Sequence, residues 1–347
     1  MQAICSASVE GWTYGPFILA SRMCAYLPYA GALRQELAAR NREWAQGRPH
    51  VESYGGDPVI VYAPCEGCHG NFFDPAYAHI ERRPEWAKRF AKIHTGGRGL
   101  PKNPEDAARK WRELDSSMSS DALLMNFFCT PGVVESAAVR RMLGVDADDL
   151  PAFGWKAKVP LKNGRFDRTE VDMRWGDLLV EAKLTESDFQ TRSAALLERY
   201  CDFEAVFDPE LLPGVAIRLT RRKQALEFPE EFTQEWEAPA DENAAIAAEF
   251  QAGIAERAEQ AAPAERGLAG YQLIRNVLAA HAHGLRFCVI HDERRPDLRE
   301  QWFAVMRAVR SADLRTRCQV LTWQELARAV PGYLQAFLEA KYGITPA

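Results

Sequence analysis

The chain has 347 residues, of which 47% are hydrophobic and 26% are charged. This composition is typical of a globular protein with one large domain or two modest ones. No apolar run is long enough to predict a membrane span, and no basic region precedes the apolar N-terminal segment, so we expect a cytoplasmic protein without a secretory signal. The formal net charge of −5 leaves nucleic-acid binding open, because a local basic patch is sufficient.

Residues 1–115 are predicted to form a mixed α/β accessory region. Its hydrophobic pattern favours a helix over 33–45, a strand over 58–62 and helical stretches over 76–92. A loop rich in glycine and proline follows over 95–104. This region shows no clear catalytic pattern.

From residue 116 onward the pattern is more regular. Helices are expected over 121–128 and 133–143, the second ended by Gly144 at the usual cap position. The two-residue hairpin signals Asn163-Gly164 and Gly176-Asp177 then separate three strand-like runs. They predict a three-stranded antiparallel meander over 153–161, 165–175 and 178–184.

The rest of the chain alternates helices and strands around an acidic, alanine-rich excursion at about 228–265. Ser187 and Gln190 form a capping-box pattern at the start of one helix, and Thr322 and Glu325 form another. The fold class predicted is α/β, a central mixed sheet flanked by helices. The elements expected are a helix over 187–200, a strand over 215–219, a helix over 268–281, strands over 287–290 and 318–321, and a helical pair ending near Tyr342.

The run RTEVDMRWGDLLVEAKLTE, residues 168–186, places acids where a strand would bury apolar groups. If Gly176-Asp177 is a two-residue turn, Asp172 lies opposite Glu181 and Glu170 lies opposite Lys183. Opposed carboxylates repel unless a cation lies between them, and Mg²⁺ prefers carboxylate oxygens. The alternative is a solvated sheet face with cross-strand ion pairs.

The hairpin resembles the PD-(D/E)XK phosphodiesterase superfamily, the restriction-endonuclease-like nucleases. The resemblance implies that Asp172, Glu181 and the Ala182 carbonyl bind Mg²⁺ or Mn²⁺ and that Lys183 orients or activates the attacking water. Val171 replaces the proline of that motif. The resemblance also implies an auxiliary acid on the preceding helix, for which Glu135 is the candidate, although a surface acid near a helix N-terminus is an equal alternative.

A later predicted helix carries the sequence YQLIRN. Together with EAKLTE, LTWQEL and KYGI, this sequence resembles a group of uncharacterised prokaryotic restriction-endonuclease-like proteins, and the resemblance covers about residues 116–345. By this likeness Gln272 and Asn276 are candidate site residues, although an amide on such a helix is ordinarily solvated. The function implied is a metal-dependent DNA endonuclease in restriction or phage defence. The alternatives are a silent nuclease scaffold that binds nucleic acid or partners, and an RNA nuclease; a homodimer is left open.

The eight cysteines are expected to be reduced thiols. Cys65, Cys68 and His69 match the spacing of a haem-attachment motif, but that chemistry needs an exported protein. We expect an ordinary loop here rather than a zinc site. Basic clusters are candidates for contacts with the DNA backbone, although most charge runs are simply solvated. The nucleic-acid-binding candidates are Arg218, Arg221, Arg222, Lys223, Lys88 and Arg89.

Overall fold

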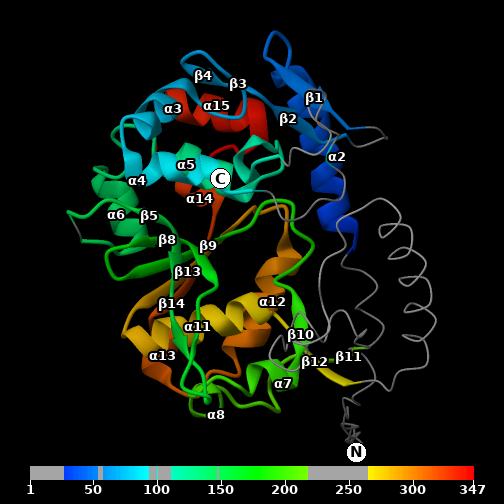
Figure 1. Ribbon diagram of the computed structural model, residues 1–347, viewed down its shortest axis with the longest axis vertical. Coiled ribbons are helices and arrows are strands. Elements are labelled where there is room, and N and C mark those ends of the chain that lie inside the picture. The colour runs from blue at the N-terminus through cyan, green and yellow to red at the C-terminus, as the bar shows by residue number, and fades with distance from the viewer. Residues whose placement is uncertain (1–26, 54–57, 94–99, 101–110, 147, 218–264) are drawn as a thin grey trace, which may run out of the picture.

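The computed structural model describes residues 27–53, 58–93, 100, 111–146, 148–217 and 265–347. A mixed five-stranded sheet lies at the centre, with helices on both faces (Figure 1). The predicted α/β class with a central mixed sheet is therefore confirmed. No described helix is both long enough and apolar enough to cross a membrane.

The central sheet has the strand order β14-β13-β9-β8-β5. Strands β14, β13 and β9 are parallel neighbours, whereas β8 runs antiparallel to both β9 and β5. The runs predicted as continuous strands over 153–161 and 165–175 are each interrupted, and their inner ends form a separate hairpin, β6 (Val159–Pro160) with β7 (Phe166–Asp167). The sheet strands are β5 (Ala152–Lys156), β8 (Glu170–Trp175), β9 (Leu178–Ala182), β13 (Arg286–His291) and β14 (Cys318–Thr322).

Each face of the sheet is covered by its own apolar core. Val180 and Ala182 of β9 pack with helices that include α5 (Ser120–Phe128) and α15 (Gly332–Tyr342). Leu179 of β9 packs on the opposite face with α11 (Tyr271–His283) and α12 (Pro296–Met306). The other helices on these faces are α6 (Ala137–Leu143), α14 (Trp323–Ala327), α13 (Ala312–Thr316), α7 (Ala194–Leu197) and α8 (Phe203–Val206).

The N-terminal region joins the first of these cores. Leu33 and Leu37 of α2 belong to the same buried cluster as Phe337 of α15, so this part of the chain packs directly on the C-terminal helices (Figure 1). The expected helix, strand and helical stretches are all present. The elements are α2 (Leu27–Trp44), β1 (His50–Glu52), β2 (Ile60–Tyr62), β3 (Pro64–Cys65), β4 (Cys68–His69), α3 (Asp74–Glu81), α4 (Pro84–Ala87), and the 3-10 turns η2 (Lys88–Ala91) and η3 (Glu113–Asp115).

The structure differs from two predicted helices in the second half of the chain. The helix over 187–200 is replaced by β10 (Thr191–Ser193) and the single-turn α7, because Gln190 takes a left-handed backbone angle, φ 63°, and Ser193 caps the helix instead. The helix over 268–281 begins only after Gly270, because the preceding residues form β12 (Glu265–Ala269). Strand β12 pairs with β10 and with β11 (Gly214–Ile217) in a second, antiparallel sheet.

The signals predicted to end or cap two other helices are confirmed. Gly144 ends α6 with φ 64°, as its position predicted. Thr322 and Glu325 form the expected capping box at the start of α14. The strand expected over 215–219 is β11, which is described as far as Ile217, and most of the acidic excursion lies outside the described residues.

Candidate active site

The turn at Gly176-Asp177 joins β8 to β9 in the predicted register. Trp175 pairs with Leu178, Arg174 with Leu179, and Met173 with Val180. The pairing then stops, so Asp172 and Glu181 are not ladder partners, and the expected placement of Glu170 opposite Lys183 is wrong. Where the backbone pairing ends, the side chain of Asp172 bonds to β9 instead: its Oδ2 accepts a hydrogen bond of 2.8 Å from the Ala182 N–H.

Beyond that point β9 is held from its other side. The Lys183 N–H donates to the Ile290 carbonyl at 2.8 Å, which continues the parallel pairing with β13. The end of β9 therefore stays paired with β13, while β8 separates from β9 and stays paired with β5. This opening places the polar side chains of both strands in a cleft of about 780 Å³.

The cleft brings together four of the residues predicted from the sequence: Asp172, Glu181, Lys183 and Gln272. They come from β8, from the end of β9 and from α11. The auxiliary-acid candidate Glu135 and the DNA-binding candidates Lys88 and Arg89 do not line it. Residues that the prediction missed also line it, including Asp121 and Ser120 of α5, Glu186, and Lys92.

Glu181 is the most enclosed acid of the cleft, with 1% of its surface exposed. Its Oε1 accepts from Lys183 Nζ and from Gln272 Nε2, each at 2.8 Å, and its Oε2 accepts from Asn276 Nδ2 at 2.8 Å. Gln272 and Asn276 are four residues apart, so they project from one face of α11. Three donors therefore fix the orientation of this carboxylate.

The cleft concentrates negative charge around Asp172. Its pKa is raised well above the ordinary aspartate value, first by burial and then by the charges of Glu181 and Asp121. Burial alone would lower the pKa of Lys183, but Glu181, together with the other nearby carboxylates, outweighs burial and raises it. Lys183 is thus a charged ammonium group between acids.

Asp121 is the acid that sequence reasoning missed on a helix preceding the sheet. It lies in the first turn of α5 and is held by Arg89 at 2.8 Å and by Lys92 at 3.0 Å. The available signal was the serine pair before it, because Ser119 caps α5 by accepting from the Ala122 N–H. The sequence predicts a helix over 121–128, but Asp121 is not among the site residues that it predicts.

Glu135, the acid chosen instead, is exposed and precedes the helix on which it was expected. The predicted helix over 133–143 begins at Ala137 because Ser136 is its N-cap, with a side chain that accepts from the Val139 N–H. Glu135 therefore stands outside the helix, next to its cap, and is not among the residues that line the cleft.

Arg89 was predicted to contact DNA, but it is only 7% exposed. Its guanidinium bridges Asp121 and Glu170, at 2.8 and 2.7 Å. Gly154 makes this possible, because a Cβ there would collide with the guanidinium, and its φ of 67° disfavours other residues. Arg89 thus positions Asp121. Lys88 is exposed, and Arg218, Arg221, Arg222 and Lys223 lie outside the described residues.

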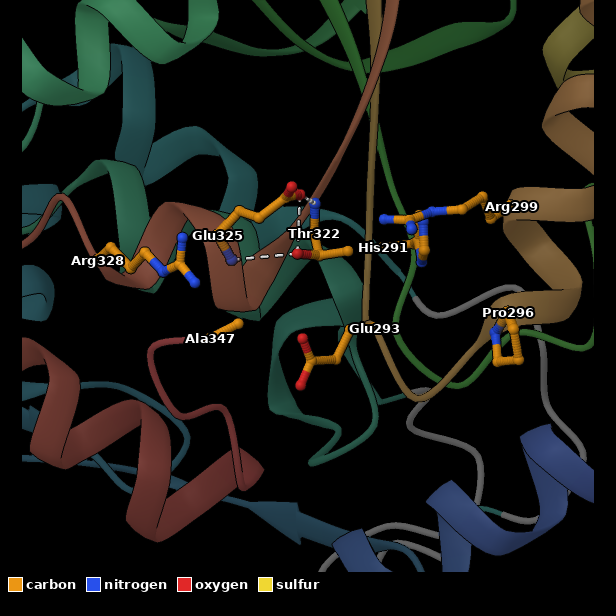
Figure 2. Close-up of a pocket in the computed structure, with 8 residues that line it drawn as sticks. All are labelled: His291, Glu293, Pro296, Arg299, Thr322, Glu325, Arg328 and Ala347. Carbon is orange, nitrogen blue, oxygen red and sulfur yellow. Dashed lines mark hydrogen bonds between the residues drawn. The ribbon is translucent and has the colours of Figure 1, made fainter.

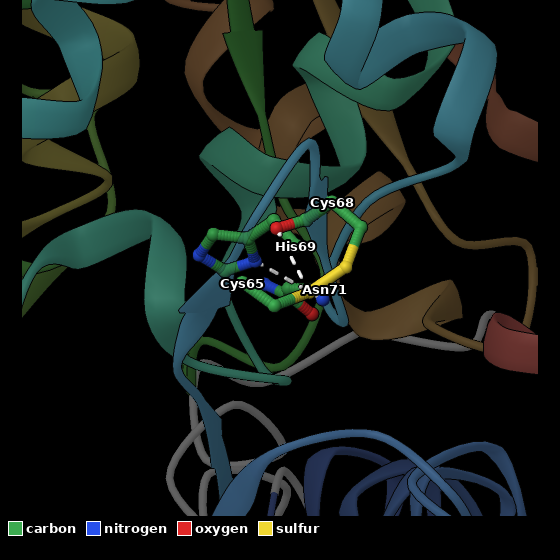
Figure 3. Close-up of a disulfide and its surroundings, with 4 residues drawn as sticks. All are labelled: Cys65, Cys68, His69 and Asn71. Atoms are coloured by element: carbon green, nitrogen blue, oxygen red, sulfur yellow. Dashed lines mark hydrogen bonds between the residues drawn. A yellow bond between two sulfur atoms is a disulfide. The ribbon is translucent and has the colours of Figure 1, made fainter.

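The expectation of reduced cysteines is wrong for one pair. Cys65 and Cys68 are cross-strand partners in the β3–β4 hairpin and form a disulfide, with Cα atoms 5.1 Å apart (Figure 3). His69 is not free to bind zinc, because its Nε2 lies 3.1 Å from Asp115 Oδ1 and its Nδ1 accepts from the Asn71 N–H. Cys129 and Cys288 are buried free thiols, as expected.

The α/β fold thus presents an aspartate, a glutamate and a lysine in one cleft at its central sheet. The chain belongs to the family described as Restriction Endonuclease associating with ARP, which it matches over residues 38–343. This membership supports a restriction-endonuclease-like nuclease. No curated protein and no solved structure gives a significant match.

Proposed function

We propose that the protein is a Mg²⁺-dependent endonuclease that hydrolyses phosphodiester bonds in DNA, in restriction or phage defence, with a site of the PD-(D/E)XK type. The observation that carries this proposal is the convergence of Asp172, Glu181 and Lys183 where β8 and β9 separate. Membership of a restriction-endonuclease family supports the choice of DNA over RNA.

The oxygen atoms of the cleft fit a hard divalent cation. Mg²⁺ is commonly bound through one or two carboxylates together with substrate phosphates and water, rather than in a cage made only of protein. The described part of the chain contains no group of three His, Cys, Asp or Glu side chains that could hold a metal ion, so water and substrate oxygens would have to complete the coordination. The pKa of Asp172 is raised first by burial and then by the charges of Glu181 and Asp121, and a bound cation would offset that repulsion.

In this proposal Asp172, Glu181 and the Ala182 carbonyl would hold the ion, and the ion would supply Lewis-acid chemistry for phosphodiester hydrolysis. Asp121 takes the auxiliary position for which Glu135 was the candidate, because Asp121 lines the cleft. Gln272 and Asn276 keep the Glu181 carboxylate turned in a fixed direction through their two hydrogen bonds.

Lys183 would place a positively charged ammonium group beside the reacting phosphate. Its ammonium has three donors, and one of them is used by Glu181 at 2.8 Å. The others can orient the attacking water or stabilise the charge that develops on the phosphate oxygens. Because the pKa of Lys183 is raised, we assign it this orienting and electrostatic role rather than that of a general base.

The test is incubation of the purified protein with circular duplex DNA, linear duplex DNA and RNA, each in Mg²⁺, Mn²⁺ or EDTA. The proposal predicts cleavage of the circular DNA in either metal and none in EDTA. Cleavage of RNA alone would overturn the choice of polymer. Absence of cleavage of all three would favour a silent scaffold.

A further inference from the structure

A second cavity lies at the carboxyl ends of the parallel strands β13 and β14, a place where α/β sheets commonly bind ligands. Its volume is about 290 Å³, at the lower limit of small-molecule sites. Figure 2 shows the side chains that surround it. They are His291, Glu293, Pro296, Arg299, Thr322, Glu325, Arg328 and Ala347.

His291 offers a buried acceptor to this cavity. It is the last residue of β13, pairs in register with Thr322 and is 1% exposed. Its Nδ1 lies 2.7 Å from the Asp292 carbonyl, which can only accept, so Nδ1 carries a proton. Burial, aided by the charge of Arg299, lowers the pKa of the imidazole and keeps it neutral.

The other ring nitrogen, Nε2, is therefore an acceptor, and it has no hydrogen-bond partner within the described residues. A buried polar atom without a partner costs about 1–3 kcal/mol. The position of His291 on the cavity wall indicates that its missing partner is a ligand group that donates, such as a hydroxyl.

Two guanidinium groups flank the same cavity. Arg299 of α12 and Arg328, directly after α14, reach it from opposite sides (Figure 2). Neither makes a hydrogen bond or ion pair with another described residue, unlike Arg294 and Arg295 nearby, which are tied to aspartates. Free guanidinium groups at one cavity are suited to a phosphate, which they can bind through two parallel hydrogen bonds.

The two acids on the cavity wall limit the charge of that ligand. Glu325 is engaged in the capping box, where its Oε2 accepts from the Thr322 N–H at 2.7 Å. Glu293 is exposed and lines the cavity together with the two arginines. It would repel a second phosphate but would accept a hydrogen bond from a hydroxyl. The cavity thus combines two cationic donors with two acceptors.

We infer that this cavity binds a hydroxyl-bearing phosphate monoester of nucleotide size, with its phosphate on Arg299 and Arg328 and its hydroxyl groups on His291 and Glu293. The ligand is either a free nucleoside monophosphate or the phosphorylated terminal nucleotide of a strand, since both carry the same groups. The inference stands apart from the proposed nuclease activity, because none of its four residues lines the catalytic cleft.

The test is isothermal titration calorimetry on the full chain in EDTA, which prevents metal-dependent cleavage. The probes are adenosine monophosphate, ribose 5-phosphate, inorganic phosphate, and one oligonucleotide with and without a 5′-phosphate. The variants are Arg299→Gln and Arg328→Gln, both at exposed positions. Arg141→Gln, which removes the same charge from an exposed position on α6, is the matched control.

Support would be one-to-one binding of an organic phosphate monoester that each cavity variant weakens by about 10-fold or more and that the control leaves unchanged. Binding of adenosine monophosphate would identify a free nucleotide as ligand. Arginine-dependent binding of the phosphorylated oligonucleotide alone would identify a strand end. The inference is overturned if no probe binds at millimolar concentration, if the arginine variants have no effect, or if inorganic phosphate binds as tightly as the esters.

Discussion

Replacing Asp172 by asparagine should stabilise the metal-free protein while abolishing the proposed metal binding. The asparagine oxygen can still accept from the Ala182 N–H, so the local hydrogen bond is kept. What is lost is a charge whose burial and repulsion by Glu181 and Asp121 outweigh its attraction to Lys183. Relief of such a conflict at an active site commonly yields about 0.5–2 kcal/mol.

For a chain of this length that gain corresponds to a rise in Tm of about 1–4 °C in EDTA at neutral pH. The sign follows from the raised pKa: the folded state prefers protonated Asp172, so the penalty of the charged form is present above the folded pKa and disappears as pH falls through it. The advantage of the variant should therefore shrink towards acidic pH.

The assay is thermal unfolding followed by circular dichroism, in EDTA and in about 10 mM Mg²⁺. This concentration is meant to saturate a site in the cleft. Wild type should gain stability from Mg²⁺, and Asp172→Asn should not. Asp148→Asn, at a fully exposed position, should leave both results unchanged. A variant that is less stable than wild type in EDTA, or that keeps the Mg²⁺ effect, would refute the reasoning.

Three further substitutions test the support of the site and of the fold. Gln272→Ala should lower kcat by about 10-fold, because Glu181 loses one of its three donors, and an unchanged rate would remove Gln272 from the site. Gly154→Ala should destabilise by about 1–3 kcal/mol in urea unfolding, because of its positive φ and the contact with Arg89; full stability would contradict that packing. Thr322→Ala should cost about 1 kcal/mol by the same measurement, and no loss would show that the capping box is dispensable.

The hairpin of the site could be predicted because its signals are local. A two-residue turn fixes the register of the strands on either side, and this gave the pairs from Trp175–Leu178 to Met173–Val180 correctly. It could not show where β8 leaves the ladder, because that depends on a side chain, Asp172, capturing the Ala182 N–H. Turn geometry alone carries no such information.

The auxiliary acid could not be chosen from the sequence because both candidate helices precede the sheet. Asp121 is placed at the cleft by Arg89 and Lys92, which come from a segment about 30 residues earlier in the chain. Such an ion-pair network leaves no periodic pattern. Arg89 looked like a surface cation for the same reason, since its buried partners Asp121 and Glu170 are distant in sequence.

The wrong helix over 187–200 has a different cause. Its capping-box letters are present, but Gln190 adopts a left-handed conformation, and its carbonyl accepts from the N–H groups of Gly270 and Tyr271. Pairing of β10 with β12, more than 70 residues away, thus overrides the local preference for a helix.

The central claim is that Asp172, Glu181 and Lys183 form a metal-dependent hydrolytic site. Its most direct test is the rate at which purified wild type and Lys183→Ala cleave supercoiled plasmid in Mg²⁺, with circular dichroism to confirm that both are folded. We predict cleavage by wild type that stops in EDTA, and a loss of about 100-fold or more in the folded variant. Equal cleavage by a folded Lys183→Ala protein would contradict the account.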